Sequence, residues 1–126
     1  MVRAQKWLMQ AKDDLDWLVD SLKGGHYAQT CFIAQQVGEK AVKALAYYRG
    51  AEVIKSHSIL AIARSLEFNA EIEKAGQILD QYYMTTRYPD TLPDGYPGEY
   101  FTREQAVEAE RLARLILETI ESEFEK

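Results

Sequence analysis

Residues 26–48, HYAQTCFIAQQVGEKAVKALAYY, decide the fold of this chain. Apolar and small side chains return there every three or four positions, which is the spacing of one face of an α-helix. A glycine pair precedes the segment, and Gly50, a suitable C-cap, follows it. The pattern predicts a helix from about His26 to Tyr48 whose inward face carries Ala28, Cys31, Phe32, Gly38, Ala41, Val42 and Leu45.

Helical periodicity continues on both sides of this segment. It covers residues 3–22, a short stretch that begins near Ser56 or His57, and a stretch that Asn69 caps and that extends to Tyr83. No segment alternates between apolar and polar residues as a half-buried strand does.

The residues Thr102-Arg-Glu-Gln105 have the form of a capping box, with Thr at the N-cap and Gln at N3. They open a last helix that runs to Phe124. The sequence therefore predicts an all-α fold, an up-and-down bundle of four long helices plus a short helix, as a single domain over residues 1–126.

Composition limits the classes of function. The chain has 126 residues, 28% of them charged, and a net charge of −5, which argues against a broad cationic surface for nucleic acid. Residues 26–57 are an exception, because they hold four basic residues against two acidic ones. No stretch approaches eighteen apolar residues and no signal-peptide h-region opens the chain, so we expect no membrane span and a cytoplasmic location.

Most catalytic templates are missing from the sequence. It has no P-loop, no glycine fingerprint for dinucleotides and no His-Glu-x-x-His. Its lone Cys31 is expected in the core, and one cysteine with two histidines argues against a transition-metal site. We therefore expect no metal and no cofactor.

A polar stripe marks the central helix, at Gln36, Glu39, Lys40 and Lys43. Their spacing places them on one helical face. Two interpretations remain open. The stripe is either a solvated face with a Glu39–Lys43 ion pair, or the lining of an interface or polar cleft.

His57 stands where a helix begins, with Arg49 and Lys55 close in sequence. Backbone N–H groups at a helix start attract anions, so one interpretation of this position is a site for an anionic ligand. The alternative is an ordinary surface histidine beside a serine N-cap.

The richest segment is residues 82–100, which hold five of the eight tyrosines and Arg87. Arginine suits bidentate contact with phosphate, and tyrosine rings stack on bases. An irregular loop of about fourteen residues is usually functional in so small a domain. In the alternative interpretation, Arg87 caps a helix C-terminus and the tyrosines pack the loop onto the bundle.

These residues also carry a family resemblance. Tyr83-Met-Thr-Thr-Arg-Tyr-Pro-Asp90 resembles the Y-x-x-T-R-Y-P-D element of small prokaryotic HEPN domains, and residues 32–45 resemble their F-x-A-Q-Q-x-x-E-K-x-x-K-A-L pattern. Residues 11–15 and 57–60 extend the likeness, so that it covers nearly the whole chain.

The resemblance implies a helical homodimer whose functional groups meet at a cleft. It also implies one of two roles: a metal-independent ribonuclease with an Arg-x4-6-His motif, or a non-catalytic partner of a minimal nucleotidyltransferase. This sequence departs from the ribonuclease motif, because seven residues separate Arg49 from His57 and no histidine follows Arg87.

The sequence and the resemblance lead to three hypotheses for the function. The first is a dimeric nucleotide- or RNA-binding module that acts with a nucleotidyltransferase in a toxin–antitoxin-like pair. The second is an endoribonuclease toxin that uses His57 and Arg87, and the third is a structural adaptor whose tyrosine-rich loop binds protein. We expect a C2 dimer also because Gly38 and its small neighbours, together with the apolar faces of the first and last helices, exceed what one bundle needs. The predicted ligand-contacting residues are Lys40, Lys43, Arg49, His57, Tyr83, Arg87 and Tyr88.

Overall fold

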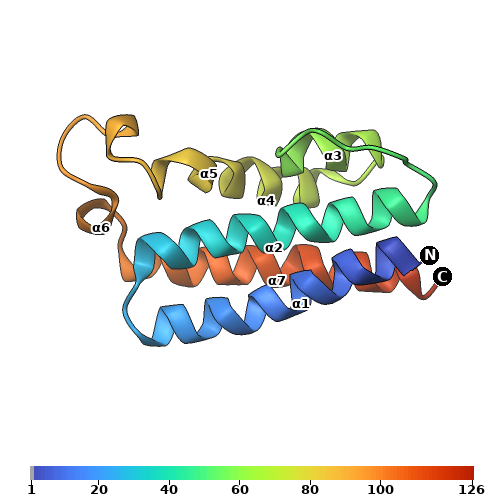
Figure 1. Cartoon of the computed structure of the whole chain (residues 1–126), viewed down its shortest axis with the longest axis horizontal. Coiled ribbons are helices and arrows are strands. Elements are labelled where there is room, and N and C mark those ends of the chain that lie inside the picture. The colour runs from blue at the N-terminus through green and yellow to red at the C-terminus, as the bar shows by residue number, and fades with distance from the viewer. Residues whose placement is uncertain (1) are drawn as a thin grey trace.

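The computed structural model describes residues 2–126, and all the regular secondary structure in that range is helical. Three helices of 22 residues lie side by side: α1 (Val2–Lys23), α2 (Tyr27–Tyr48) and α7 (Arg103–Phe124) (Figure 1). The predicted all-α bundle is confirmed. Within residues 2–126, no helix combines the length and apolar character needed to cross a membrane.

A second row of shorter helices runs along the other side of α2 (Figure 1). It consists of α3 (Ile59–Ser65), α4 (Ala70–Asp80) and α5 (Tyr82–Thr85). The loop beyond them contains the 3₁₀ turn η1 (Pro89–Thr91) and α6 (Pro97–Tyr100), so the segment expected to be irregular has some helical structure of its own.

Helix α2 is the centre of the molecule. It packs against α1, α3, α4, α5, α6 and α7, and 16 of its 22 residues are buried. Its frequent alanines allow neighbouring helices to approach from every side. A helix buried all round is normally apolar all round. The polar residues buried on α2 therefore need partners.

The lone Cys31 is completely buried on α2, as expected from its apolar surroundings. Burial raises the pKa of the thiol to about 12. The reactive form of a cysteine is the thiolate, so Cys31 acts as a small core residue.

Local signals fixed several helix ends correctly. The Asn69 side chain accepts a hydrogen bond from the Ile72 N–H, and both arms of the Thr102–Gln105 capping box are formed. Two boundaries were wrong. The third helix begins at Ile59, because Ser58 is its N-cap, and the fourth ends at Asp80, with a turn at Gln81 before α5.

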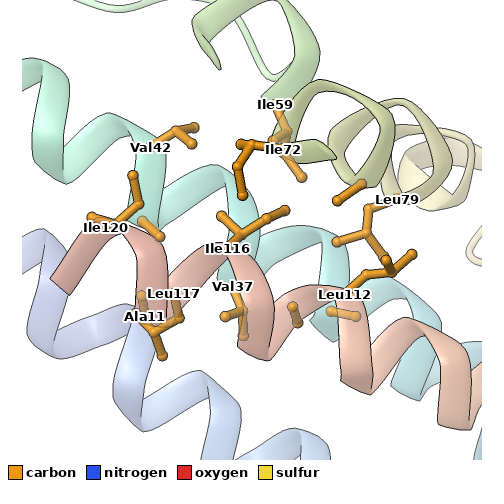
Figure 2. Close-up of a cluster of buried hydrophobic side chains, with 14 of the residues drawn as sticks. Ala11, Val37, Val42, Ile59, Ile72, Leu79, Leu112, Ile116, Leu117 and Ile120 are labelled. Atoms are coloured by element: carbon orange, nitrogen blue, oxygen red, sulfur yellow. The ribbon is translucent and has the colours of Figure 1, made fainter. Parts of the chain in front are cut away.

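Gly38 makes a close contact within the single chain, which removes the sequence argument that it serves a dimer interface. A Cβ atom at Gly38 would lie 2.7 Å from Cδ1 of Ile59, and one at Gly76 would lie 2.8 Å from Cγ2 of the same residue. Ile59 thus fills a notch between α2 and α4, within the apolar cluster that includes Ile72 and Ile116 (Figure 2).

This notch predicts a compensating pair of substitutions. Gly38→Ala should destabilise the fold by about 1 kcal/mol, because overpacking costs more than the helix propensity that alanine gains. Ile59→Val removes the clashing Cδ1 and alone costs about 0.5–1.5 kcal/mol. The double variant should lose less than the sum of the two, as measured by urea unfolding. Strict additivity would show that the notch does not exist.

Candidate functional site

The site begins with the way α3 is capped. The Asp80 carboxylate, at the end of α4, accepts hydrogen bonds from the Ser58 hydroxyl at 2.9 Å and from the N–H groups of Ile59 and Leu60 at 2.9 and 3.0 Å. The Ser58 hydroxyl oxygen in turn accepts from the Ala61 N–H. These backbone groups already hold a carboxylate of the protein, so they are not free to receive a ligand anion.

Gln35 ties this capped end to α2. Its side chain is fully buried, and Nε2 donates to the backbone carbonyl of His57 at 3.0 Å. The same amide lies 3.3 Å from a Glu39 oxygen and 3.4 Å from an Asp80 oxygen. Sequence reasoning missed Gln35 and Asp80 as members of the site. For Gln35 the available signal was its position in the middle of a helix rich in small residues.

His57 is held by a buried ion pair. Lys43 Nζ lies 2.8 Å from Glu39 Oε2, and these two side chains are only 5% and 6% exposed. The same Glu39 oxygen lies 3.1 Å from Nδ1 of His57. The Glu39–Lys43 pair was predicted correctly, but the face that carries it is buried and forms the inner wall of a polar site.

The contact with Glu39 determines how His57 faces solvent. A carboxylate accepts a hydrogen bond, so Nδ1 carries the proton and Nε2 of the neutral ring is an acceptor. The His57 side chain is 56% exposed. The imidazole is therefore anchored on its inner edge and available on its outer edge.

Tyr83 and Arg87 complete the cluster from the second row of helices. The His57 and Tyr83 rings stack, with centroids 5.1 Å apart and planes 16° apart. The Arg87 guanidinium lies 4.7 Å from the Tyr83 ring, and its Nε donates to the Tyr83 carbonyl at 2.9 Å. The rings of Phe32 and Tyr88 flank the same guanidinium at 4.5 and 5.0 Å.

Arg87 supplies a positive charge to the cluster. Among residues 2–126, no carboxylate forms an ion pair with it, so its charge can meet an external anion. An open depression of about 230 Å³ is lined by His57, Ser58, Asp80 and Tyr83, and the last of these is in contact with Arg87. That volume admits a phosphate or a single base.

The other predicted cations are placed differently. Lys40 pairs with Asp14 of α1, and Arg49 pairs with Glu123 of α7 at 2.8 Å. Arg49, the C-cap residue of α2, is also ten residues beyond Glu39, or about 15 Å along the helix axis. Arg49 and His57 are close in the sequence, but the structure does not bring their side chains together. The positive balance of residues 26–57 is offset by carboxylates from other helices.

Some tyrosines of residues 82–100 pack the loop onto the bundle, and others are exposed. Tyr82 packs edge-on against Phe101, with centroids 5.8 Å apart, and burial raises the pKa of its hydroxyl. It therefore holds the loop to the bundle. Tyr88, Tyr96 and Tyr100 are exposed, and of these Tyr88 contacts Arg87.

A helical bundle centred on a buried helix in this arrangement is a known class of domain. Residues 4–123 match the HEPN domain family, and the chain belongs to that family.

Individual relatives agree with this assignment. The crystal structure of TT1696 from Thermus thermophilus is 40% identical, with a TM-score of 0.91 over 97% of this chain and 98% of that one. ST0689, described as an archaeal HEPN homologue, is 35% identical, with a TM-score of 0.84 over 95% and 96%. A Methanocaldococcus jannaschii protein named "Putative toxin MJ1304" is 27% identical over 93% of this chain and 85% of its own.

Loss of the Asp80 cap should disturb the site directly. Asp80→Ala leaves two N–H groups and a hydroxyl without their acceptor, which should lower the free energy of unfolding by about 2–4 kcal/mol. The exposed cap Asn69→Ala is the control, with an expected loss of about 1 kcal/mol. Amide hydrogen exchange should accelerate at Ile59 and Leu60 in the Asp80 variant, while the amide of Ile72 stays protected. Unchanged exchange at Ile59 would contradict this role of Asp80.

Proposed function

We propose that this HEPN protein binds nucleotide or single-stranded RNA through His57, Tyr83 and Arg87. The observation that carries the proposal is the stacked cluster in which one tyrosine ring contacts both an oriented imidazole and an arginine free of internal carboxylates. Arginine matches the geometry of phosphate oxygens, and tyrosine accepts a base on its face.

The other predicted residues differ in how closely they take part in the proposed binding. Tyr88 is exposed beside Arg87 and offers a second ring. Lys43 acts through Glu39, whose position it fixes, and Lys40 lies at the margin of the site. Arg49, paired with Glu123, is left out.

We propose further that the protein works in a toxin–antitoxin-like pair with a minimal nucleotidyltransferase. Similarity to the M. jannaschii protein named as a toxin supports the toxin-like role. The exposed Met84, Tyr88, Tyr96 and Tyr100 offer the partner a surface with aromatic anchors. A neighbouring gene with the pattern G-S-x10-D-x-D, whose product co-purifies with this chain, would support the pairing.

Binding should depend on Arg87. Arg87→Ala should weaken the affinity for short RNA or nucleotides at least tenfold, because a charge-assisted phosphate contact is lost. Arg87→Lys should recover only part of it, since lysine lacks the planar fork. Arg114→Ala is the matched control, because Arg114 is exposed on α7 and pairs only with Glu110. Calorimetry that detects no heat with any RNA or nucleotide would refute the proposal and favour the adaptor function.

A second function, metal-independent cleavage of RNA, is favoured by the Glu39–His57 contact. A neutral imidazole held by a carboxylate is a suitable general base. Its Nε2 would take the proton from a ribose 2′-hydroxyl as the 2′-oxygen bonds to phosphorus. The bond to the 5′-oxygen breaks, and that oxygen takes a proton from water. Arg87 would stabilise the charge that grows on the phosphate oxygens.

Cleavage makes a distinct prediction. Wild-type protein in the presence of EDTA should convert RNA to fragments with 2′,3′-cyclic phosphate and 5′-hydroxyl ends. His57→Ala should reduce the rate by about 10²–10⁴-fold, because the general base is lost. Equal rates for the wild type and the His57→Ala/Arg87→Ala double variant would assign any activity to a contaminant.

We also propose that the protein is a homodimer, as the family resemblance implies. Exposed Val2 and Met9 on α1 and Val107 on α7 support it, because they leave apolar surface outside the single bundle. Light scattering at micromolar concentration should give twice the 14.5 kDa mass of one chain. A mass of one chain across that range would contradict the dimer.

A further inference from the structure

A second depression, outside the cluster described above, lies between α1 and α2. It has a volume of about 240 Å³ and is lined by Lys6, Trp7 and Gln10 of α1 and by Lys40 of α2. An indole ring, two ammonium groups and an amide are the groups that receive a base and its adjoining phosphate.

Short contacts connect this depression to His57. The Lys43 ammonium lies 5.5 Å from the centre of the Trp7 ring and 2.8 Å from Glu39 Oε2. The same Glu39 oxygen lies 3.1 Å from His57. The start of α1 also contacts the segment that leads to His57, because Arg3 donates to the Glu52 carbonyl at 2.7 Å. Trp7 and His57 therefore flank the same strip of α2.

The Trp7 ring is held in place before any ligand binds. It packs on Tyr47 with ring centroids 5.6 Å apart, and Arg3 covers the Tyr47 ring at 3.9 Å. Gln10 is fixed as well, since its Nε2 donates to Asp14 at 2.9 Å and leaves the amide oxygen as an acceptor. A rigid platform of this kind saves ordering entropy on binding.

The charges suit a base with one neighbouring phosphate. Lys40 is offset by Asp14 and Lys43 by Glu39. Lys6 is exposed and forms no ion pair among residues 2–126. The depression thus adds a single uncompensated positive charge to an aromatic face.

We propose that this depression is a nucleobase subsite, where a base of single-stranded RNA stacks on Trp7 while a phosphate farther along the strand lies at His57 and Arg87. The inference rests on the proposed RNA-binding function and extends it to α1. The subsite makes binding favour oligonucleotides that are long enough to reach both clusters.

Fluorescence provides the test, because Trp7 and Trp17 are the two tryptophans of the chain. In a Trp17→Phe protein, a tetranucleotide RNA should quench the emission of Trp7, and inorganic phosphate should not. Arg87→Ala added to this protein should shift the RNA titration to higher concentration. RNA binding that depends on Arg87 but leaves Trp7 emission unchanged would overturn the subsite and preserve the proposed function. No binding in either readout would overturn both.

Affinity provides the second measurement. Trp7→Leu should weaken tetranucleotide binding roughly tenfold, since stacking on one ring is lost. Trp7→Phe should keep most of the affinity, which separates stacking from a packing defect. Trp17→Leu is the matched control, because Trp17 lies on the same helix and is 56% exposed but lines neither depression. Equal losses for the Trp7→Leu and Trp17→Leu proteins would contradict a subsite at Trp7.

Discussion

The carboxylate of Asp80 holds the N-terminus of α3, and both the core and the site depend on this contact. By binding the N–H groups of Ile59 and Leu60, it sets where the chain turns from an extended segment into a helix. Because α3 begins at Ile59, the side chain of this residue enters the notch between Gly38 and Gly76. It also leaves His57, two residues earlier, at the surface beside Glu39.

The buried Glu39–Lys43 pair is a poor source of stability, because desolvation offsets most of the attraction between two buried charges. An apolar pair of similar volume at these positions would serve the core as well. The pair instead supplies a carboxylate at a fixed point below His57, with Lys43 neutralising it and Gln35 limiting its movement. This arrangement orients an exposed imidazole from inside the bundle, which a surface carboxylate on a flexible side chain cannot do.

Much of this architecture was readable from the sequence, because helix period and caps are local. The capping box at Thr102 and the Asn69 cap depend on residues three positions apart. The cap of α3 was missed because Asp80 is 20 residues from Leu60 along the chain. The ion pairs made by the cations of residues 26–57 were missed for the same reason. Arg49 meets its carboxylate 74 residues later, on a helix whose register no local pattern reveals.

Carboxylates of the chain pair with Lys40, Lys43 and Arg49, and this affects how the protein can recognise RNA. In a protein of net charge −5, Arg87 is a cation with no ion-pair partner among residues 2–126, and three aromatic rings surround it. Non-specific attraction to nucleic acid grows with the number of phosphates neutralised, and here that number is small. Affinity of the proposed kind must therefore come from rings and from fixed geometry. Such a site can discriminate a particular single-stranded ligand, whereas a broad basic surface would hold any polyanion.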